Sequence, residues 1–486
     1  MKSRVMLLVL AGLAFGAASR ITVVQAQAAP FASGSPPADV VATRPVASVV
    51  DDYVREALKS NLSLRAQSLT VERSFAALDA VRAHFFPTLA LEARYSWSEG
   101  GRLLQLPLGD LMNPVYASLN QLLSAQGRPA EFTPIQNESF NFLRQREQDT
   151  RITVRQALYA PAIPAAVRVQ SSLLEAAQFN RLAVARRLKR DVTVGYLDWL
   201  KATRTVGIVD ASVALLAENV RVSESLYRNG KVTQDQVLRA RAELLGVQQQ
   251  LREARNGESQ AKSYLNFLLN RSLDEPLQSA AIDAEITHTG RDLAQLRAVA
   301  LANRPEVAQL DREVHAAQAQ IQVARAALKP TLSLGVDAGT NDERYDFGYG
   351  RNFGTISLLL HWQFFDGGAS EAEVHSERAE AHRAAVLRDA LTQQIQLEVE
   401  QSLDNLTTSA DSLATADARA AAARAGFRIA SRKRDEGVIN QVEFIDARST
   451  LTSAELNLNV TRFELLARQA ELDYATAAGT LPLEAL

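Results

Sequence analysis

The chain has 486 residues, of which 53 are Lys or Arg and 55 are Asp or Glu, so its formal net charge is −2. This balance leaves no basic excess to neutralise phosphates, which argues against nucleic acid as a partner. The absence of cysteine excludes disulfides, thiolate metal sites, a cysteine nucleophile and lipidation of an N-terminal cysteine. With 47% hydrophobic but only 6% aromatic residues, the composition favours a folded chain rich in long helices.

The N-terminus has the layout of a secretory signal. Two basic residues precede an apolar run over residues 5–18, and a small-residue cleavage site ends at Ala28. The run is shorter than the roughly 20 residues that span a bilayer, which favours a cleaved signal over a membrane anchor. We therefore predict a signal peptide over residues 1–28 and an N-terminal linker, rich in Ala, Pro and Ser, over residues 29–45.

The rest of the chain contains an internal repeat. Pro330-Thr331-Leu332 repeats Pro87-Thr88-Leu89 at an offset of 243 residues, and Gly437 repeats Gly230 at an offset of 207. The first half therefore holds about 36 extra residues, which we place in a long loop over 99–148 because that stretch is rich in Pro, Asn and Gln. The predicted organisation is a first repeat over 46–270, a linker over 271–293, a second repeat over 294–480 with its loop at 339–352, and a C-terminal tail over 481–486.

Each repeat is predicted to contain two strands of about ten residues. Helical patterns around 46–85 and 294–328 end at Pro87 and Pro330, because proline disfavours helix in the residue before it. Apolar and polar residues then alternate, and the alternation recurs before the next helices, so each strand has one apolar and one polar or charged face. The apolar faces include Leu89, Leu91, Tyr95, Trp97, Leu332, Leu334, Leu358 and Trp362.

Two structures explain this alternation. One is an ordinary antiparallel sheet that covers a helical core, and the other is the lipid-facing wall of a membrane β-barrel. The strand length suits a membrane span, and Trp97 and Trp362 suit an aromatic belt at the membrane interface. Four strands cannot close a barrel and lipid does not tolerate an open sheet edge, so the barrel requires several chains. Three chains would supply twelve strands and leave room for a passage.

A very long helical segment follows the second strand of each repeat. Apolar residues recur every seven positions over 192–227 and over 399–427, and the period resumes beyond each central glycine. A sustained period of seven predicts left-handed supercoiled helix pairs. Gly230 and Gly437 supply the chain reversals, so each repeat should end in a long helical hairpin with its tip near one of these glycines.

Several short sequences occur in a recognisable order. The tips read Tyr227-Arg228-Asn229-Gly230-Lys231-Val232-Thr233 and Gly437-Val438-Ile439-Asn440, and a strand-to-helix junction reads Trp362-Gln363-Phe364-Phe365-Asp366-Gly367-Gly368. Together with the signal peptide, the repeat and the helix–proline–strand boundaries, they make roughly residues 46–480 resemble the outer membrane efflux protein family. These proteins are the TolC-like exit ducts of Gram-negative bacteria.

The resemblance implies a mixed α and β membrane protein. The expected assembly is a homotrimer whose twelve-stranded transmembrane β-barrel lies in outer-membrane lipid and continues into a long antiparallel α-helical barrel in the periplasm. The expected partners are a periplasmic adaptor (membrane fusion) protein and an inner-membrane transporter. The expected function is passive conduction of substrate to the exterior, in a tripartite efflux or type I secretion system.

The resemblance also points to residues near the tips. Glu443 and Asp446 match the positions of the family's acids at the periplasmic constriction. Since they lie three residues apart on a helix, three chains would bring six carboxylates into a ring that attracts cations. A solvated helix face explains the same pair equally well.

Two further sets of residues follow from the resemblance. Gln236, Arg434 and Ile439 occupy positions of the family's gate latch but differ in residue type from the prototype, so pairing of Arg434 or Arg239 with the two acids is an alternative latch. The tips themselves would dock on the adaptor, although turn formation alone also explains their glycines. The tip residues are Gly230, Lys231, Val232, Gly437, Val438 and Ile439.

The sequence gives no indication of an enzyme. It has no Gly-x-x-x-x-Gly-Lys-Ser/Thr loop and no Gly-x-Ser-x-Gly elbow, and His375 and His382 are too far apart on a helix to share one ion. We expect no catalytic site, metal or cofactor. Two alternatives to a duct are a secreted or periplasmic coiled-coil scaffold or adhesin without a channel, and a periplasmic adaptor, against which the tandem halves argue.

Overall fold

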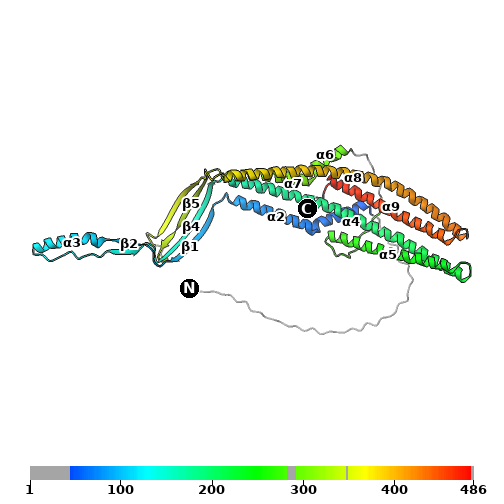
Figure 1. Cartoon of the computed structure of the whole chain (residues 1–486), viewed down its shortest axis with the longest axis horizontal. Helices are drawn as coiled ribbons and strands as arrows, with labels where there is room; N and C mark the ends of the chain where they lie inside the picture. Colours follow the sequence, from blue (N-terminus) through cyan, green and yellow to red (C-terminus); the bar gives the residue numbers. More distant parts are fainter. Residues whose placement is uncertain (1–43, 282–291, 346–347, 483–486) are drawn as a thin grey trace, which may run out of the picture. The chain divides into compact units, whose positions relative to one another are not determined.

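The computed structural model describes residues 44–281, 292–345 and 348–482, and the predicted signal peptide lies outside these ranges. Helices make up most of the described chain (Figure 1). In chain order the elements are α1 (Val46–Ser60), α2 (Leu62–Ala83), β1 (Thr88–Trp97), β2 (Leu103–Leu106), α3 (Leu108–Ala125), β3 (Glu138–Asn141), β4 (Arg146–Tyr159), α4 (Ala162–Arg228), α5 (Gln234–Leu268), α6 (Leu293–Asn303), α7 (Pro305–Ala326), β5 (Thr331–Asp342), β6 (Asn352–His361), α8 (Ala369–Asp435) and α9 (Gln441–Ala475).

The four long strands form one antiparallel sheet in the order β1-β4-β5-β6 (Figure 1). Strands from the two halves of the chain pair directly, because β4 is hydrogen-bonded to β5. The register sets Leu91 beside Ile152, and Ile152 beside Ala338. On β6, Ile356 lies beside Val336. The alternating apolar residues of all four strands therefore share one face of the sheet.

Prolines mark the passage from helix to strand at the predicted positions. α2 is followed by Pro87 and then β1, and α7 is followed by Pro330 and then β5. Each helical segment before these prolines is divided into two helices. Asn61 separates α1 from α2, and its side chain caps α2 by accepting a hydrogen bond from the Leu64 N–H at 3.1 Å.

The long helices form two hairpins of equal dimensions. α4 and α8 each have 67 residues and α5 and α9 each have 35, so α4 is about 100 Å long. α4 packs on α5 and α8 packs on α9, and α4 also packs on α7 and α9. None of the helices in the described ranges has both the length and the apolarity to cross a membrane. Buried heptad positions include Val192, Trp199, Val220, Val399, Leu406, Ala420, Phe444 and Leu451.

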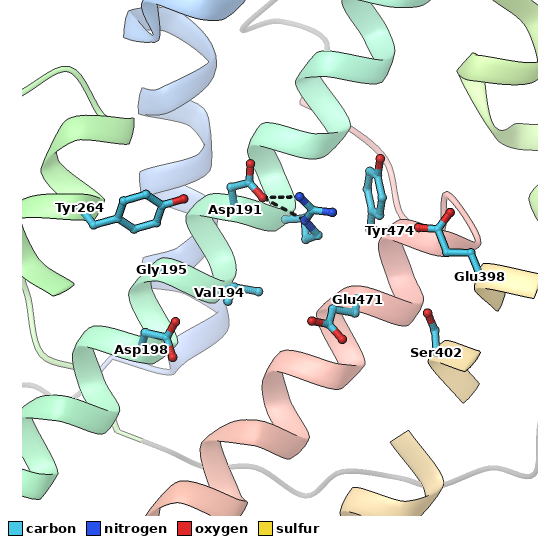
Figure 2. A pocket seen from close by; sticks show the side chains of 10 residues that line it. Asp191, Val194, Gly195, Asp198, Tyr264, Glu398, Ser402, Glu471 and Tyr474 are labelled. Atoms are coloured by element: carbon cyan, nitrogen blue, oxygen red, sulfur yellow. Dashed lines mark hydrogen bonds and ion pairs between the residues drawn. The ribbon is translucent and has the colours of Figure 1, made fainter. Parts of the chain in front are cut away.

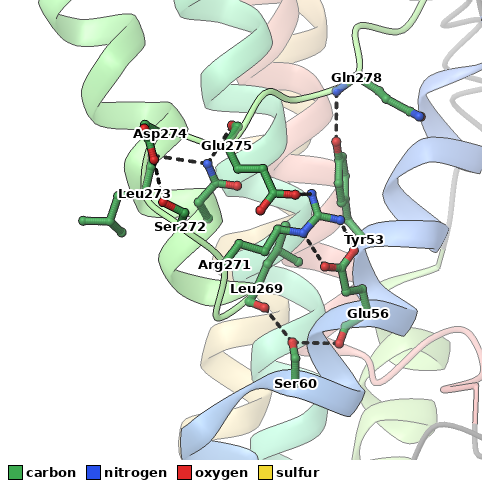
Figure 3. Close-up of polar contacts among 11 residues, drawn as sticks. Tyr53, Glu56, Ser60, Leu269, Arg271, Ser272, Leu273, Asp274, Glu275 and Gln278 are labelled. Atoms are coloured by element: carbon green, nitrogen blue, oxygen red, sulfur yellow. Dashed lines mark hydrogen bonds and ion pairs between the residues drawn. The ribbon is translucent and has the colours of Figure 1, made fainter. Parts of the chain in front are cut away.

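An apolar core lies where α1 packs on α4. The rings of Tyr53 and Tyr196 have centroids 5.5 Å apart. The backbone of Gln278 binds both tyrosines. Its N–H donates to the Tyr53 hydroxyl at 3.0 Å, and its carbonyl accepts from the Tyr196 hydroxyl at 2.8 Å. Arg271 pairs with Glu56 on α1 (Figure 3), and this hydrogen bond raises the pKa of the arginine. These contacts tie the segment after α5 to α1.

The structure corrects the expectation of a loop over 99–148. β2 and β3 pair in a second, two-stranded sheet, and the 18-residue helix α3 lies between them in the chain. Pro114 lies inside α3, and Asn113 and Asn120 use their side chains to bond a neighbouring backbone segment. Proline and asparagine are typical of turns, so composition alone did not reveal the ordered structure that these side chains support.

Candidate functional site

One face of the four-stranded sheet carries a series of ion pairs. Arg151 on β4 lies 2.8 Å from the Asp149 carboxylate and 3.5 Å from the Glu92 carboxylate on β1. Arg155, further along β4, lies 3.0 Å from Asp337 on β5. Because side chains alternate between faces along a strand, these charges lie on the same side and make it hydrophilic.

The opposite face is apolar and exposed in the single chain. Leu89, Leu91 and Leu358 expose 74%, 71% and 68% of their surface. Burial of such a side chain contributes roughly 1.5–3 kcal/mol, so a row of them marks a surface that belongs against an apolar phase. Of the other residues predicted to face lipid, those that are exposed are Tyr95, Trp97 and Trp362, and those that are half-buried are Leu332 and Leu334.

The hairpin tips are built around two glycines with positive φ. Gly230 has a φ of +68° and Gly437 one of +73°, a conformation that favours glycine. In each tip the residue after the glycine donates its N–H to a carbonyl of the preceding helix, at 2.9 and 2.7 Å, which closes the helix end. Of the predicted docking residues, Lys231 and Val438 are exposed and Val232 and Ile439 are half-buried.

The two predicted constriction acids, Glu443 and Asp446, are exposed at the start of α9. Asn440 caps this helix by accepting from the Glu443 N–H at 2.9 Å and donating to the Glu443 carboxylate at 3.1 Å, an arrangement similar to a capping box. Phe444 is 2% exposed, and the Arg434 guanidinium lies over its ring at 4.1 Å. Glu443 therefore has a structural role at the tip in addition to its charge.

The other predicted latch residues lie on the first hairpin. Gln236 is half-buried and Arg239 is exposed, both in the first turns of α5. Arg239 lies 4.0 Å from the Asp235 carboxylate in its own helix. Among the ion pairs and hydrogen bonds found within the described residues, none brings Gln236 or Arg239 to the two constriction acids of the same chain.

Buried polar side chains join the two hairpins, and these were not predicted. Arg448 on α9 is 7% exposed, and its Nε–H donates to the Ser212 hydroxyl on α4 at 3.3 Å. The hydroxyls of Ser212 and Thr452 lie 3.3 Å apart, and Asn459 donates to the Thr205 hydroxyl at 3.1 Å. Burial lowers the pKa of Arg448. The spacing of four and seven residues along α9 was the signal that could have revealed this set.

A pocket of about 450 Å³ lies among α4, α5, α8 and α9 (Figure 2). Arg190, one of its lining residues, pairs with Asp191 at 2.6 Å. In the described part of the chain, no group of three or more His, Asp or Glu side chains is placed to hold a metal ion. The carboxylates that line the pocket are Asp191, Asp198, Glu398 and Glu471.

Arg304 anchors the helices beside this pocket. It is 6% exposed, and its guanidinium donates two hydrogen bonds of 3.0 Å to Glu306 and one of 3.1 Å to Glu398. The same guanidinium lies 4.8 Å from the centroid of the Tyr474 ring. Burial lowers the pKa of Arg304, but the two carboxylates together outweigh it and raise the pKa above the ordinary value. One arginine thus connects α7, α8 and α9.

Solved structures with the same fold cover most of the chain. The outer-membrane channel OprN matches with a TM-score of 0.72 and 18% identity, over 89% of this chain and 90% of its own. The CmeC outer-membrane channel of Campylobacter jejuni matches with a TM-score of 0.74 and 15% identity, over 94% of both chains. At such identities the likeness shows the fold alone. That fold, dominated by helices, is the fold of the TolC-like outer-membrane channels.

A family model matches the second part of the chain. Residues 296–478 match the family model described as outer membrane efflux protein. The predicted resemblance to this family is therefore confirmed, and the outer membrane is the location that the family and its relatives indicate.

Named relatives match part of the chain. The pyoverdine export outer membrane protein OpmQ of Pseudomonas putida is 24% identical over 289 residues, which are 58% of this chain and 60% of the relative. The solvent efflux pump outer membrane protein SrpC of Pseudomonas putida is 23% identical over 60% of this chain and 62% of its own. Protein CyaE of Bordetella pertussis is 30% identical over 34% of this chain and 35% of its own. The chain thus matches at most 62% of the length of these relatives.

Proposed function

We propose that the chain is an outer-membrane exit duct that passively conducts substrate from a periplasmic transporter–adaptor assembly to the exterior. The observation that best supports this proposal is the four-stranded sheet, which has one apolar face and one charged face. A barrel wall in a membrane needs apolar side chains toward lipid and hydrophilic ones toward a water-filled passage. The exposed leucines and the ion pairs around Arg151 supply these two faces. A coiled-coil scaffold or adhesin would gain nothing from an apolar sheet face in water.

Closure of the barrel requires more than one chain. The sheet has four strands, with β1 and β6 at its edges. The smallest membrane barrels have about eight strands, and lipid does not tolerate an open edge. Side chains fill the interior of an eight-stranded barrel, whereas twelve strands leave a passage. We therefore infer a homotrimer in which β6 of one chain pairs with β1 of the next.

The helices would extend this duct into the periplasm. The equal lengths of α4 and α8, and of α5 and α9, support the predicted two-fold repeat. Hairpins about 100 Å long suit an antiparallel helical barrel that crosses the periplasm. The tips, with Lys231 and Val438 exposed, would meet the adaptor and the inner-membrane transporter. Glu443 and Asp446 of three chains would form an acidic ring near the inner end of the passage.

Two neighbouring residues on opposite faces of β1 test the barrel. Leu91 lies on the apolar face, and Ala90 lies on the charged face opposite Thr153. Leu91→Arg should cost about 2–4 kcal/mol per chain if the residue faces the middle of a bilayer, and should remove channel events in planar bilayers. Ala90→Arg should insert and conduct like the wild type. Equal tolerance of the two substitutions would contradict a lipid-facing sheet.

A further inference from the structure

One face of α3 is covered by the segment that returns toward β3. The Asn113 side chain exchanges two hydrogen bonds of 2.9 Å with the backbone of Ile135. Asn120 does the same with Phe132, donating at 2.7 Å and accepting at 3.1 Å. The Tyr116 ring lies 5.3 Å from the Phe132 ring, centroid to centroid. Because these residues of α3 lie three, four and seven apart, they share one face of the helix.

The opposite face of α3 is an exposed apolar row. Leu108, Val115 and Leu122 lie seven residues apart and are 42%, 50% and 62% exposed. Leu111, four residues before Val115, is 66% exposed. This is the a and d spacing of a coiled coil, the pattern by which one helix packs on another. We name this row the α3 seam, and its residues are Leu108, Leu111, Val115, Ser118, Leu122 and Ala125.

The charges of α3 favour another helix over lipid as the occupant of this seam. An amphipathic helix that lies on a membrane surface is typically rich in Lys and Arg on its polar face. α3 has no basic residue, and its single acid, Asp110, accepts a hydrogen bond from Asn137 at 2.9 Å. Because no residue of the seam is charged, identical seams can meet without repulsion.

We propose that the α3 seams of three copies of this chain pack together as a parallel three-helix coiled coil. The proposal rests on the proposed homotrimer. α3 is inserted between β1 and β4, which are neighbours in the sheet, so a shared barrel would hold three α3 helices at the same end. Pro114 removes a hydrogen bond from the interior of α3 and weakens the isolated helix. Contact with two partner helices offsets this loss and orders the mouth of the duct.

Adjacent positions on α3 allow a matched cross-linking test. The natural chain has no cysteine, so a single introduced thiol is the only one present. Ser118 lies in the seam and Ala117 lies outside it, and both residues are exposed in the single chain. A trifunctional maleimide is added to the membrane-extracted full chain. Ser118→Cys should give a covalent three-chain species, whereas Ala117→Cys should remain mainly as single chains.

The native mass of the same samples separates the seam from the trimer. If both variants have a native mass of three chains but show equal cross-linking, the seam is wrong and the duct stands. A native mass of one chain would overturn both the packing of the α3 seams and the trimeric duct. Adding Leu122→Glu to Ser118→Cys should remove the covalent three-chain species while the native mass stays at three chains, because the barrel still closes. A cross-link that survives this charge in the seam would also overturn the proposal.

Discussion

Arg304 shows how a single charge can hold helices from distant parts of the chain. Its guanidinium is buried between Glu306 on α7 and Glu398 on α8, and it donates to the Ala475 carbonyl at the end of α9 at 3.3 Å. A buried ion pair of this kind is costly to break from one side, because the remaining charges lose their partner. The main effect of Arg304 is to fix the position at which α7, α8 and α9 meet.

Replacement of Arg304 should therefore destabilise the protein. Arg304→Met preserves much of the side-chain volume but leaves Glu306 and Glu398 unpaired, at a cost on the order of 3 kcal/mol. The thermal unfolding midpoint of the membrane-extracted protein should fall. Arg383→Met is the control, because Arg383 pairs with Glu380 on the exposed surface of α8 and should leave the midpoint unchanged. Equal midpoints for the two variants would show that the buried cluster adds no stability.

The two tip acids should act on ions through their charge. Replacing Glu443 by Gln and Asp446 by Asn removes six charges from the proposed ring, so the preference of the channel for cations over anions should fall. Gln still offers an acceptor to Asn440, which preserves the cap of α9. The charge-preserving pair Glu443→Asp and Asp446→Glu is the control. Reversal potentials in planar bilayers measure the preference, and identical values in all proteins would place these acids outside the passage.

At the scale of the elements, the tip glycines should matter more than glycines within helices. Gly437 has a φ of +73°, so Gly437→Ala should cost about 1–2 kcal/mol locally. Gly246 lies inside α5 with open space around it, so Gly246→Ala should instead stabilise that helix by about 0.5–1 kcal/mol. Faster amide hydrogen exchange around the second tip, and weaker capture of the proposed adaptor, should appear only with Gly437→Ala. Unchanged hydrogen exchange and unchanged capture of the proposed adaptor would contradict both the structural role and the docking role of this tip.

The elements that sequence patterns predicted are those that local rules determine. Pro87 and Pro330 disfavour helix in the residues before them, and a period of seven fixes the buried face of α4 and α8 without knowledge of the partner. Alternation likewise assigned Leu91 and Leu358 to the apolar faces of their strands before the structure placed both strands in one sheet. The hairpin turns at Gly230 and Gly437 follow from the preference of glycine for positive φ.

Other features depend on contacts between distant residues. Arg448 is 236 residues from Ser212, and Arg304 is 94 residues from Glu398, so no local pattern identifies the partners that these arginines bind. α3 was missed because Pro114 and its asparagines are typical of turns. Asn113 is tied to Ile135, 22 residues further along, and that pairing is visible only in the folded chain.

At the scale of the whole molecule, the single chain leaves its four-stranded sheet open. Its sheet has two unpaired edges and an exposed apolar face. If copies of the chain shared a barrel in lipid, the edges would pair with neighbouring chains and the apolar face would contact lipid. The ion pairs of the opposite face would then line the passage, and the helical hairpins would continue it. A closed barrel and a continuous passage both require that the functional unit contains more than one chain.

The native mass of the membrane-extracted mature chain, corrected for bound detergent, tests this requirement most directly. We predict a mass of three chains, because three four-stranded sheets close a twelve-stranded barrel that can hold a passage. A folded protein with the mass of a single chain, or a chain recovered only in the soluble fraction, would leave the sheet unclosed and would contradict the exit duct.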